Sequence, residues 1–210
     1  MSGDPQGPEA TLAEQWDARY RKAPDLWTHE PNALLAQFAA PLQPGRAVDV
    51  GAGDGRNAIW LATHGWGVTA IDVSAVALER ASQRADARGA RLECVVADWR
   101  DHPLGEASLE LVVVSFMHPQ QGDRDALFGR AARALVAGGH LFTVGVALAD
   151  HGRRGPPDAD RLYTPQRLRD SLHGLDVVRC EEHSYEQHDS SGRRTVTDVV
   201  AIARRPRASY

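Results

Sequence analysis

Three glycines spaced two residues apart, Gly51, Gly53 and Gly55, follow the short apolar run that ends in VDV. Glycine adopts backbone conformations that other residues avoid, and it lets a ligand come close to the main chain. Helix-forming residues begin at about Asp54, and the first amides of a helix lack partners inside the helix. A strand, a glycine turn and a helix in this order predict a site where backbone amides hydrogen-bond a ligand. We expect Gly51, Ala52 and Gly53 to contact that ligand.

Two acidic residues follow the next two apolar runs of the chain. Asp72 ends one run and Asp98 follows the other. The carboxyl ends of adjacent parallel strands lie on one edge of a sheet, where such sheets bind ligands. A carboxylate at Asp72 can accept hydrogen bonds from both ribose hydroxyls, and one at Asp98 from the exocyclic amine of adenine. Val73 and Trp99 can cover the two faces of the purine, so the pattern predicts a nucleoside ligand.

Dinucleotide-binding enzymes also have a glycine turn after their first strand, so the turn alone does not identify the ligand. In this sequence Arg56 stands where a G-x-G-x-x-G motif needs its third glycine, which allows the helix to pack closely on the strand. Asp49, just before the turn, is also unusual in a dinucleotide motif. An NAD(P)-dependent oxidoreductase is therefore our third choice of function.

Composition narrows the class of protein. The chain has 210 residues, which predicts one domain with a small appendage. Its formal net charge of -4 and pI of about 6.1 give no support for a nucleic-acid partner, which favours a basic face. The longest apolar run, 111–117, is too short to span a bilayer, and the first ten residues lack the features of a signal peptide. We therefore expect a cytoplasmic protein with no membrane partner.

The elements that must position these residues alternate between apolar strands and amphipathic helices. The first five expected strands are 47–50, 68–73, 92–97, 109–116 and 141–146. They lack polar alternation, which is typical of a parallel sheet with helices on both faces. We expect Ser74 and Asp123 to cap two of the helices, and Gly138 and Gly139 to end the second one.

Further segments extend this core at both ends. Two short helices within 11–44 form an N-terminal cap, and the polar loop 149–163 has the length of a functional lid. Residues 177–187 and 195–203 are expected to form an antiparallel hairpin, because a short turn-like segment joins them. The chain is thus divided into a disordered start, a helical cap, a main domain and a tail, at 1–10, 11–44, 45–205 and 206–210.

With these features described, residues 45–205 resemble the class I S-adenosylmethionine-dependent methyltransferases. VDVGAGDG resembles the first motif of that family, Asp72 its ribose-binding acid, and ADW at 97–99 its adenine-contacting motif. ELVVVSFMHP at 110–119 is similar to the fourth strand and the loop facing the methyl group. GDGRNAIWLA and the N-terminal WDARY pattern resemble the branch that contains tellurite-resistance-type and many small-molecule methyltransferases.

The resemblance implies a doubly wound α/β fold with a seven-stranded, mostly parallel sheet, a C-terminal antiparallel hairpin and an N-terminal helical cap. It implies S-adenosylmethionine as cofactor, S-adenosylhomocysteine as product and a small-molecule methyl acceptor. A non-catalytic S-adenosylmethionine-binding module is the first alternative. In that branch the N-terminal segment folds over the cofactor, which would bring Tyr20 and Trp27 close to the charged sulfur. The expected cofactor-binding residues are Tyr20, Trp27, Asp49, Gly51, Ala52, Gly53, Arg56, Asn57, Asp72, Val73, Asp98, Trp99 and Ser115.

Methyl transfer to a phenol, alcohol or amine usually needs a base, and His118 after the fourth strand is our choice. The alternative for His118 is a hydrogen bond to the backbone at the strand end. Arg56 and Arg19 are candidates to hold the methionine carboxylate, or they are solvated charges. Arg153 and Arg154 can receive an anionic substrate or lie on a solvated loop, which we favour. The histidine spacings match no metal motif, so we expect no metal.

Overall fold

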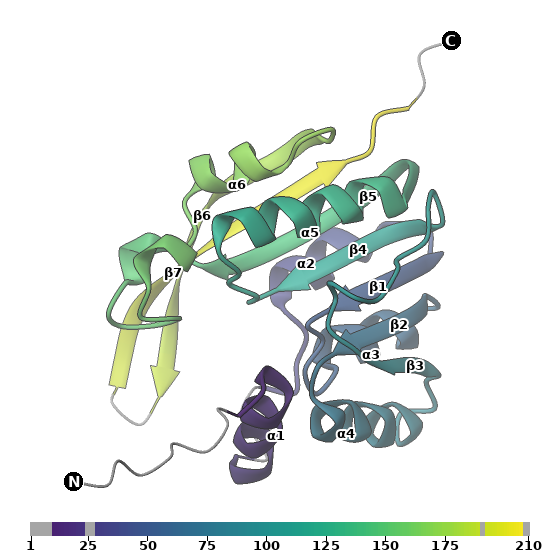
Figure 1. The fold of residues 1–210 in the computed structure, drawn as a ribbon, viewed down its shortest axis with the longest axis horizontal. Coiled ribbons are helices and arrows are strands. Elements are labelled where there is room, and N and C mark those ends of the chain that lie inside the picture. The colour runs from purple at the N-terminus through teal and green to yellow at the C-terminus, as the bar shows by residue number, and fades with distance from the viewer. Residues whose placement is uncertain (1–9, 24–27, 190–191, 208–210) are drawn as a thin grey trace, which may run out of the picture.

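A computed structural model describes residues 10–23, 28–189 and 192–207 (Figure 1). They form one seven-stranded sheet with the order β3-β2-β1-β4-β5-β7-β6. The strands are β1 Arg46–Val50, β2 Gly67–Asp72, β3 Leu92–Val96, β4 Leu109–Ser115, β5 Leu135–Val146, β6 Asp176–Asp189 and β7 Gly192–Arg204. The helices are α1 Leu12–Lys22, α2 Ala33–Ala39, α3 Arg56–Thr63, α4 Ala75–Asp86, α5 Gln121–Ala134 and α6 Pro165–Ser171, with the short 3-10 helices η1 Leu148–Asp150 and η2 Ala159–Arg161. The expected fold class is confirmed.

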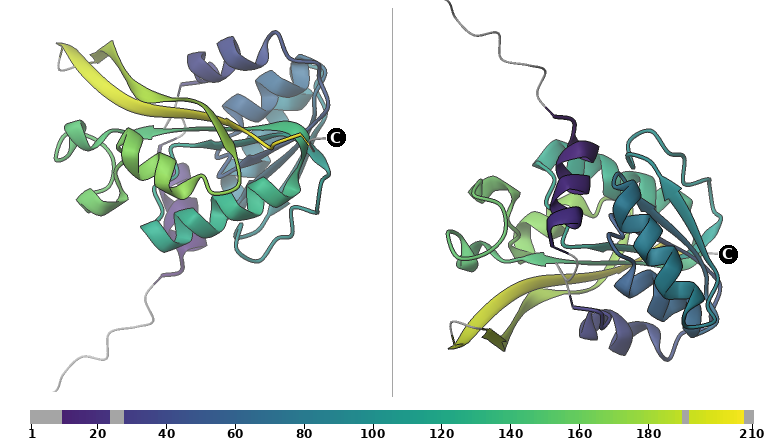
Figure 2. Two further views of the ribbon diagram at one scale, coloured as in Figure 1. Left: turned by 90° about the horizontal axis from the view of Figure 1, so that it is seen from above. Right: turned by 90° about the horizontal axis from the view of Figure 1, so that it is seen from below.

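Strand β4 shows why the parallel strands are apolar on both faces. Val112 and Val114 pack with α5 and α6, whereas Leu111 and Val113 pack with α2 and α3 on the opposite face. All four side chains are fully buried. Burying one such side chain contributes about 1.5–3 kcal/mol. Figure 2 shows the two helical layers enclosing the sheet, so the carboxyl edge is where the ends of β1, β2 and β4 are available to a ligand.

The last two strands form the expected antiparallel hairpin. Strand β7 lies between β5 and β6 and pairs with β5 only from Arg204 to Asp198, opposite Val146. Beyond that point the strand partner of β7 is β6, although the Ala147 amide still donates to the Thr197 carbonyl (3.1 Å). Residues 184–189 and 192–197 therefore extend past the carboxyl edge of the sheet. We call these two segments the overhanging hairpin; it projects clear of the sheet in Figure 1.

The boundary between α5 and β5 corrects two expectations. Helix α5 begins after Gln120, and Asp123 lies in its first turn rather than at the cap. The helix ends at Ala134, so Gly138 and Gly139 lie inside β5, where the pairing with β4 is irregular. Arg205 determines this end, because its guanidinium donates to the carbonyls of Arg133 (2.9 Å) and Leu135.

Helix α1 is attached to the main domain at the start of α4. The Asp17 carboxylate accepts from Ser74 Oγ (2.6 Å) and from the Val76 amide (3.2 Å). Arg80 donates to the carbonyl of Tyr20 (2.8 Å). These contacts position the C-terminal part of α1 over the carboxyl edge. Among the described helices, none has the length and apolar character needed to cross a membrane.

Candidate functional site

The glycine turn after β1 has a backbone that requires glycine. Gly51, Gly53 and Gly55 have φ angles of 70°, 56° and 81°, a region that side chains disfavour. A Cβ at Gly51 would lie 2.5 Å from Met117 Sδ, and one at Gly53 would lie 2.4 Å from the Tyr20 hydroxyl. The amides of Gly51 and Ala52 donate to the carbonyl of the β2 residue Ile71 at 2.8 and 3.0 Å. The turn is therefore fixed against the neighbouring strand and leaves no room for side chains.

Asp72, at the end of β2, is held by two backbone amides. Its Oδ2 accepts from Gly53 (2.8 Å) and its Oδ1 from Ser74 (2.9 Å). Burial raises the pKa of Asp72 above its usual value, and these amide bonds oppose that shift. Val73, the next residue, is half-buried. The carboxylate is thus oriented beside the glycine turn, where a ligand with two hydroxyls can reach its remaining lone pairs.

Asp49, on β1 just before the turn, is a buried acid without a hydrogen-bond donor. Its side chain is buried, and neither carboxylate oxygen has a partner within the described residues. Burial raises its pKa to about 7, while the charge of Arg56 opposes the shift. The backbone amide of Ala58 also lowers this pKa, but its geometry does not qualify as a hydrogen bond to Asp49. Buried acceptors normally have donors, so the pair of oxygens fits a ligand that brings a cationic donor.

The start of α3 places Arg56 and Asn57 at the same edge. Arg56 donates to Thr28 Oγ1 (3.1 Å), and its guanidinium lies 5.5 Å from the centre of the Phe116 ring. Burial lowers the pKa of Arg56, and nearby acids oppose that shift. Asn57 is buried, and its Oδ1 accepts from the Asn32 amide at 2.9 Å. Asn57 therefore joins α3 to the start of α2.

The residues after β3 are engaged with protein groups. Asp98 accepts from Arg100 on both carboxylate oxygens, at 2.9 to 3.2 Å. Burial raises the pKa of Asp98, but the bonds and charge of Arg100 outweigh it, so the pKa lies below its usual value. Trp99 is 9% exposed and belongs to the core below α5. The guanidiniums of Arg100 and Arg130 lie 5.8 and 6.0 Å from its ring.

The end of β4 has a strained backbone beside the turn. Phe116 has a φ of 54°, although it is not glycine, and such a conformation costs about 1–3 kcal/mol. Its amide donates to the Val144 carbonyl (2.7 Å), and the Tyr163 hydroxyl donates to the Met117 carbonyl (2.5 Å). The buried hydroxyl of Ser115 has no partner in the described parts of the chain. Strain of this kind is typical of positions that the surrounding structure holds for function.

His118 follows directly, and its ring is bonded to the backbone. Its Nε2 accepts from the Val146 amide at 2.9 Å, and its carbonyl accepts from Arg161 Nε. Burial and the nearby charge of Arg161 lower the pKa of His118 to about 4. A neutral imidazole has one nitrogen lone pair, and this bond uses it. The role of base stays a prediction, and the observed bond is the structural alternative for this residue.

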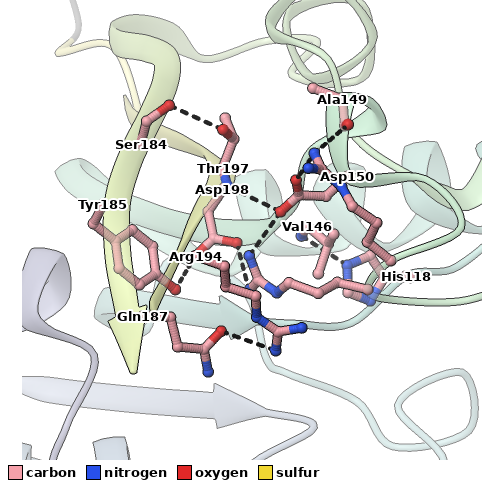
Figure 3. A network of polar contacts seen from close by, with 12 residues as sticks. His118, Val146, Ala149, Asp150, Ser184, Tyr185, Gln187, Arg194, Thr197 and Asp198 are labelled. Atoms are coloured by element: carbon pink, nitrogen blue, oxygen red, sulfur yellow. Dashed lines mark hydrogen bonds and ion pairs between the residues drawn. The ribbon is translucent and has the colours of Figure 1, made fainter. Parts of the chain in front are cut away.

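A network of polar contacts joins the loop after β5 to the overhanging hairpin (Figure 3). Arg154 donates to Asp150 (3.1 Å) and to Asp198 (2.9 Å), and both carboxylates are buried. Asp150 also accepts from the Thr197 amide at 2.9 Å, and Tyr185 donates its hydroxyl proton to Asp198 at 3.0 Å. Arg154 is thus part of a buried ion pair, which corrects the expectation of a solvated arginine. Arg153 remains largely exposed and bonds Asp150.

These observations divide the expected residues into groups. The glycine turn, Asp49, Asp72, Arg56 and Tyr20 lie together around the ends of β1 and β2. Tyr20 is 4% exposed, with its hydroxyl above the turn. Arg19 is exposed and lies over the Trp16 ring, 5.0 Å away, while Trp27 is outside the described residues.

Sequence reasoning missed Asp150, Asp198 and Tyr185. The available signal was Asp198, a single acid inside the apolar run VTDVVAIA. A shallow hollow lined by Trp66, Glu110 and His140 lies at the amino edge of the sheet, away from all these groups. No three metal-ligating side chains gather within the described ranges.

The sequence of residues 47–139 matches the model of a family described as a methyltransferase domain. A release factor glutamine methyltransferase from Bordetella pertussis is 33% identical over 191 residues, covering 79% of this chain and 71% of the relative. A ribosomal RNA small subunit methyltransferase C from Alcanivorax borkumensis is 28% identical over 144 residues. That match covers 64% of this chain and 44% of the relative, so the chain spans less than half of that protein.

Solved structures with the same fold include the following two. One, described under the conversion of a disulfide bond into a thioacetal group during echinomycin biosynthesis, has a TM-score of 0.74 and 24% identity. That alignment covers 95% of this chain and 93% of the other. TehB from Haemophilus influenzae has a TM-score of 0.70 and 17% identity, with 91% of this chain and 67% of TehB covered.

Proposed function

The chain belongs to the class I S-adenosylmethionine-dependent methyltransferases, and from this premise we propose that it methylates a small molecule. It is an enzyme of the transferase class with S-adenosylmethionine as cofactor. That membership removes the nicotinamide oxidoreductase from consideration. The identity of the methyl acceptor and the roles of the individual site residues belong to the proposal.

The cofactor site is the part of the proposal with the strongest support. Asp72 would accept from the ribose hydroxyls, since its carboxylate is already oriented by Gly53 and Ser74. Asp49 would accept from the ammonium of the methionine group, because its two buried oxygens have no donor among the described residues. Arg56, half-buried nearby, would hold the methionine carboxylate. The single observation that supports the proposal best is this unpartnered acid beside a turn without room for side chains.

Further residues would complete the ligand's surroundings. Tyr20 above the turn would cover the methionine end of the ligand, and its ring would attract the sulfonium. The Asp98 carboxylate would receive the adenine amine in place of one of its present bonds to Arg100. Val73, Trp99, Asn57 and Ser115 would contribute to the walls of the site, with Asn57 acting through α2. The expectation that Trp27 would contact the ligand is part of the proposal.

The chemistry would depend on position and on the exclusion of water. S-adenosylmethionine supplies the methyl group from a positively charged sulfur. The chain's own residues orient the acceptor in line with that group and keep water out, which can supply much of the rate. If the acceptor must lose a proton, His118 can take it only after its bond to the Val146 amide opens. A marked loss of turnover in His118→Ala with unchanged cofactor affinity would support that role.

Two observations support a small acceptor. The structure described under the conversion of a disulfide bond into a thioacetal group during echinomycin biosynthesis shares the fold over 95% of this chain, and its description names neither RNA nor a release factor. The net charge of -4 also disfavours a nucleic-acid acceptor. The curated relatives are named for ribosomal RNA and a release factor, so both kinds of macromolecule belong in the test as competing acceptors.

The proposal is tested by incubating the protein with S-adenosylmethionine and a panel of thiols, phenols, alcohols, amines and chalcogen oxyanions. Release of S-adenosylhomocysteine is the readout, and Asp72→Asn, which should bind the cofactor more weakly, is the control. We expect release with at least one small-molecule class. Turnover only with ribosomal RNA or a release factor peptide would replace the small acceptor. Cofactor binding without turnover on any acceptor would favour the non-catalytic module.

A further inference from the structure

The overhanging hairpin presents one face toward the carboxyl edge. In β6, Tyr185 pairs with Val196 of β7, and Gln187 pairs with Arg194. Alternate residues of a strand point to the same side, so Tyr185 and Gln187 share a face, whereas Ser184 points to the other. Figure 3 shows Tyr185, Gln187 and Arg194 on the side of the hairpin that carries Asp198. The hairpin extends beyond the carboxyl end of β5, the strand next to β4.

Tyr185 is fixed in place although it is exposed. Its side chain is 37% exposed, yet its hydroxyl donates to Asp198 Oδ2 at 3.0 Å. Asp198 is in turn held by Arg154, which also pairs with Asp150. His183 lies against the ring of Tyr185, with centroids 5.7 Å apart. An exposed aromatic ring with a locked orientation loses little conformational entropy when a ligand binds.

The same group faces the proposed cofactor site. The Val146 amide donates to His118 Nε2 (2.9 Å), and Val146 pairs with Asp198 across β5 and β7, so Asp198 and the Tyr185 hydroxyl bonded to it lie close to the loop after β4. The Asp198 carboxylate also raises the pKa of Arg56 at the start of α3. The charge of Arg154, which holds Asp198, lowers the pKa of His118 after the end of β4. The hairpin face therefore lies across from the start of α3 and from the end of β4. An acceptor between them would contact the hairpin on one side and the methyl donor on the other.

We propose that Tyr185 is an acceptor-binding residue that selects acceptors with a hydroxyl or amine donor over thiolates and oxyanions, an inference that rests on the proposed function. The reason is the direction of its hydrogen bond. Because the phenol proton is committed to Asp198, the Tyr185 oxygen can only accept from a ligand. A hydroxyl or amine supplies the required proton. An anionic acceptor supplies none and would meet the oxygen lone pair with the Asp198 carboxylate behind it.

In this account Asp198 is a positioning residue. It touches the hydroxyl of Tyr185 and determines which way that hydroxyl points. Arg154 and Asp150 hold Asp198 in turn, so the loop after β5 and the hairpin act as one wall of the acceptor site.

The test compares wild type with Tyr185→Phe on a matched pair of acceptors, namely the best hydroxyl or amine acceptor from the panel and its thiol analogue at a pH where the thiol is ionised. We expect wild type to prefer the hydroxyl or amine. Tyr185→Phe keeps the ring and should lower kcat/KM for that acceptor about tenfold, as for the loss of one hydrogen bond. It should not lower kcat/KM for the thiolate, because the oxygen that disfavours an anion is removed, and it should leave the dissociation constant of S-adenosylhomocysteine unchanged.

Ser184→Ala is the matched control, since it removes one hydroxyl bond, to Thr197, from the other face of the same hairpin. It should change neither kcat/KM. Asp198→Asn should reproduce the selective loss, and a fall in the ratio of the two kcat/KM values distinguishes mispositioning from a general loss of folded protein. Equal loss on both acceptors in Tyr185→Phe, equal loss in Ser184→Ala, or a wild type that prefers the thiolate would overturn the inference while leaving the proposed function intact. Absence of turnover on every small molecule would overturn both.

Discussion

At the scale of single residues, Gly53 lies so close to the Tyr20 hydroxyl that no side-chain carbon fits between them. A Cβ at Gly53 would meet the Tyr20 hydroxyl at 2.4 Å, and the φ of +56° is strained for any side chain. We predict that Gly53→Ala lowers the free energy of unfolding by about 1–2 kcal/mol from backbone strain alone, with a further loss from the clash. Cofactor affinity should fall as well, because Tyr20 must move. Denaturant titration and calorimetry measure the two effects.

Gly89 offers a matched control for that substitution. It has a φ of +66°, and nothing lies within 4 Å of a Cβ built there. Gly89→Ala should therefore show the strain without the clash and without any loss of cofactor affinity. The Tyr20→Phe background removes the clashing hydroxyl and should restore part of the loss in Gly53→Ala. Equal effects at Gly53 and Gly89 would mean that the contact with Tyr20 has no consequence.

Because Asp49 is buried, we predict an unusual dependence of the free energy of unfolding on pH. Burial raises its folded-state pKa to about 7, while the unfolded chain has a pKa of about 3.9. Between these values the folded state binds the extra proton, so the free energy of unfolding falls as pH rises from about 4 to 7. The shift corresponds to an effect on the order of 4 kcal/mol for this buried group.

The substitution Asp49→Asn removes this titration and keeps the shape. We expect the ligand-free variant to be more stable than wild type at pH 8, by roughly 1–4 kcal/mol, and nearly equal at pH 4.5. Its affinity for S-adenosylmethionine should nevertheless fall, since the proposed partner of the ammonium is lost. Asp86→Asn, at an exposed position, is the control. A variant no more stable than wild type at pH 8 would refute this account of Asp49.

How far the site could be predicted differs between neighbouring residues. Asp49 and Asp72 could be selected from the sequence because acids are uncommon within and at the ends of apolar strands, and their contacts with the cofactor stay predictions. Tyr185 and Asp198 were not, because only the register of the hairpin brings them together, and register depends on contacts between distant segments. A backbone bond was the stated alternative for His118, but its partner Val146 could not be identified, since 28 residues separate the two.

At the scale of elements, the attachment of α1 depends on Asp17. Its carboxylate accepts from Ser74 Oγ and the Val76 amide at the start of α4, an arrangement equivalent to an N-cap supplied by another helix. We predict that Asp17→Ala costs about 1 kcal/mol in the free energy of unfolding. It should also speed proteolysis within α1 and weaken cofactor binding, because α1 carries Tyr20.

Arg21→Ala separates this effect from surface charge. Arg21 pairs with Asp17 at 3.3 Å, but its side chain is 64% exposed, and such pairs contribute little. The substitution leaves the bonds from Asp17 to α4 in place, so proteolysis of α1 should stay at the wild-type rate. If Arg21→Ala loosens α1 as much as Asp17→Ala does, the cap at α4 is not what holds the helix.

The ends of the helices show where tertiary contacts override the local sequence pattern. Ser74, Asn32 and Thr164 cap their helices as their residue types predict. The end of α5 does not follow its glycines, because Arg205, some 70 residues later, bonds the last carbonyls of the helix. No local pattern contains that information.

At the scale of the whole molecule, the strand order brings the functional groups together. Strands β1 and β4 are neighbours at the centre of the sheet, with β2 beside β1, so their carboxyl ends meet at one edge although they are distant in sequence. This arrangement followed from the alternation of apolar strands and helices, which permits few topologies. The hairpin was also expected, at 177–187 and 195–203, and β6 and β7 reach only slightly further, to Asp189 and from Gly192. Its extension past the carboxyl edge was not expected, because it depends on where β7 stops pairing with β5.

The central claim is that the ends of β1 and β2 bind the adenosyl cofactor, and calorimetric titration of S-adenosylhomocysteine into wild type and Asp72→Asn tests it most directly. The account predicts saturable binding to one site per chain in wild type, and at least tenfold weaker binding in the variant, because the oriented carboxylate is lost. The absence of binding heat in wild type at several temperatures, or equal affinity in the two proteins, would contradict it.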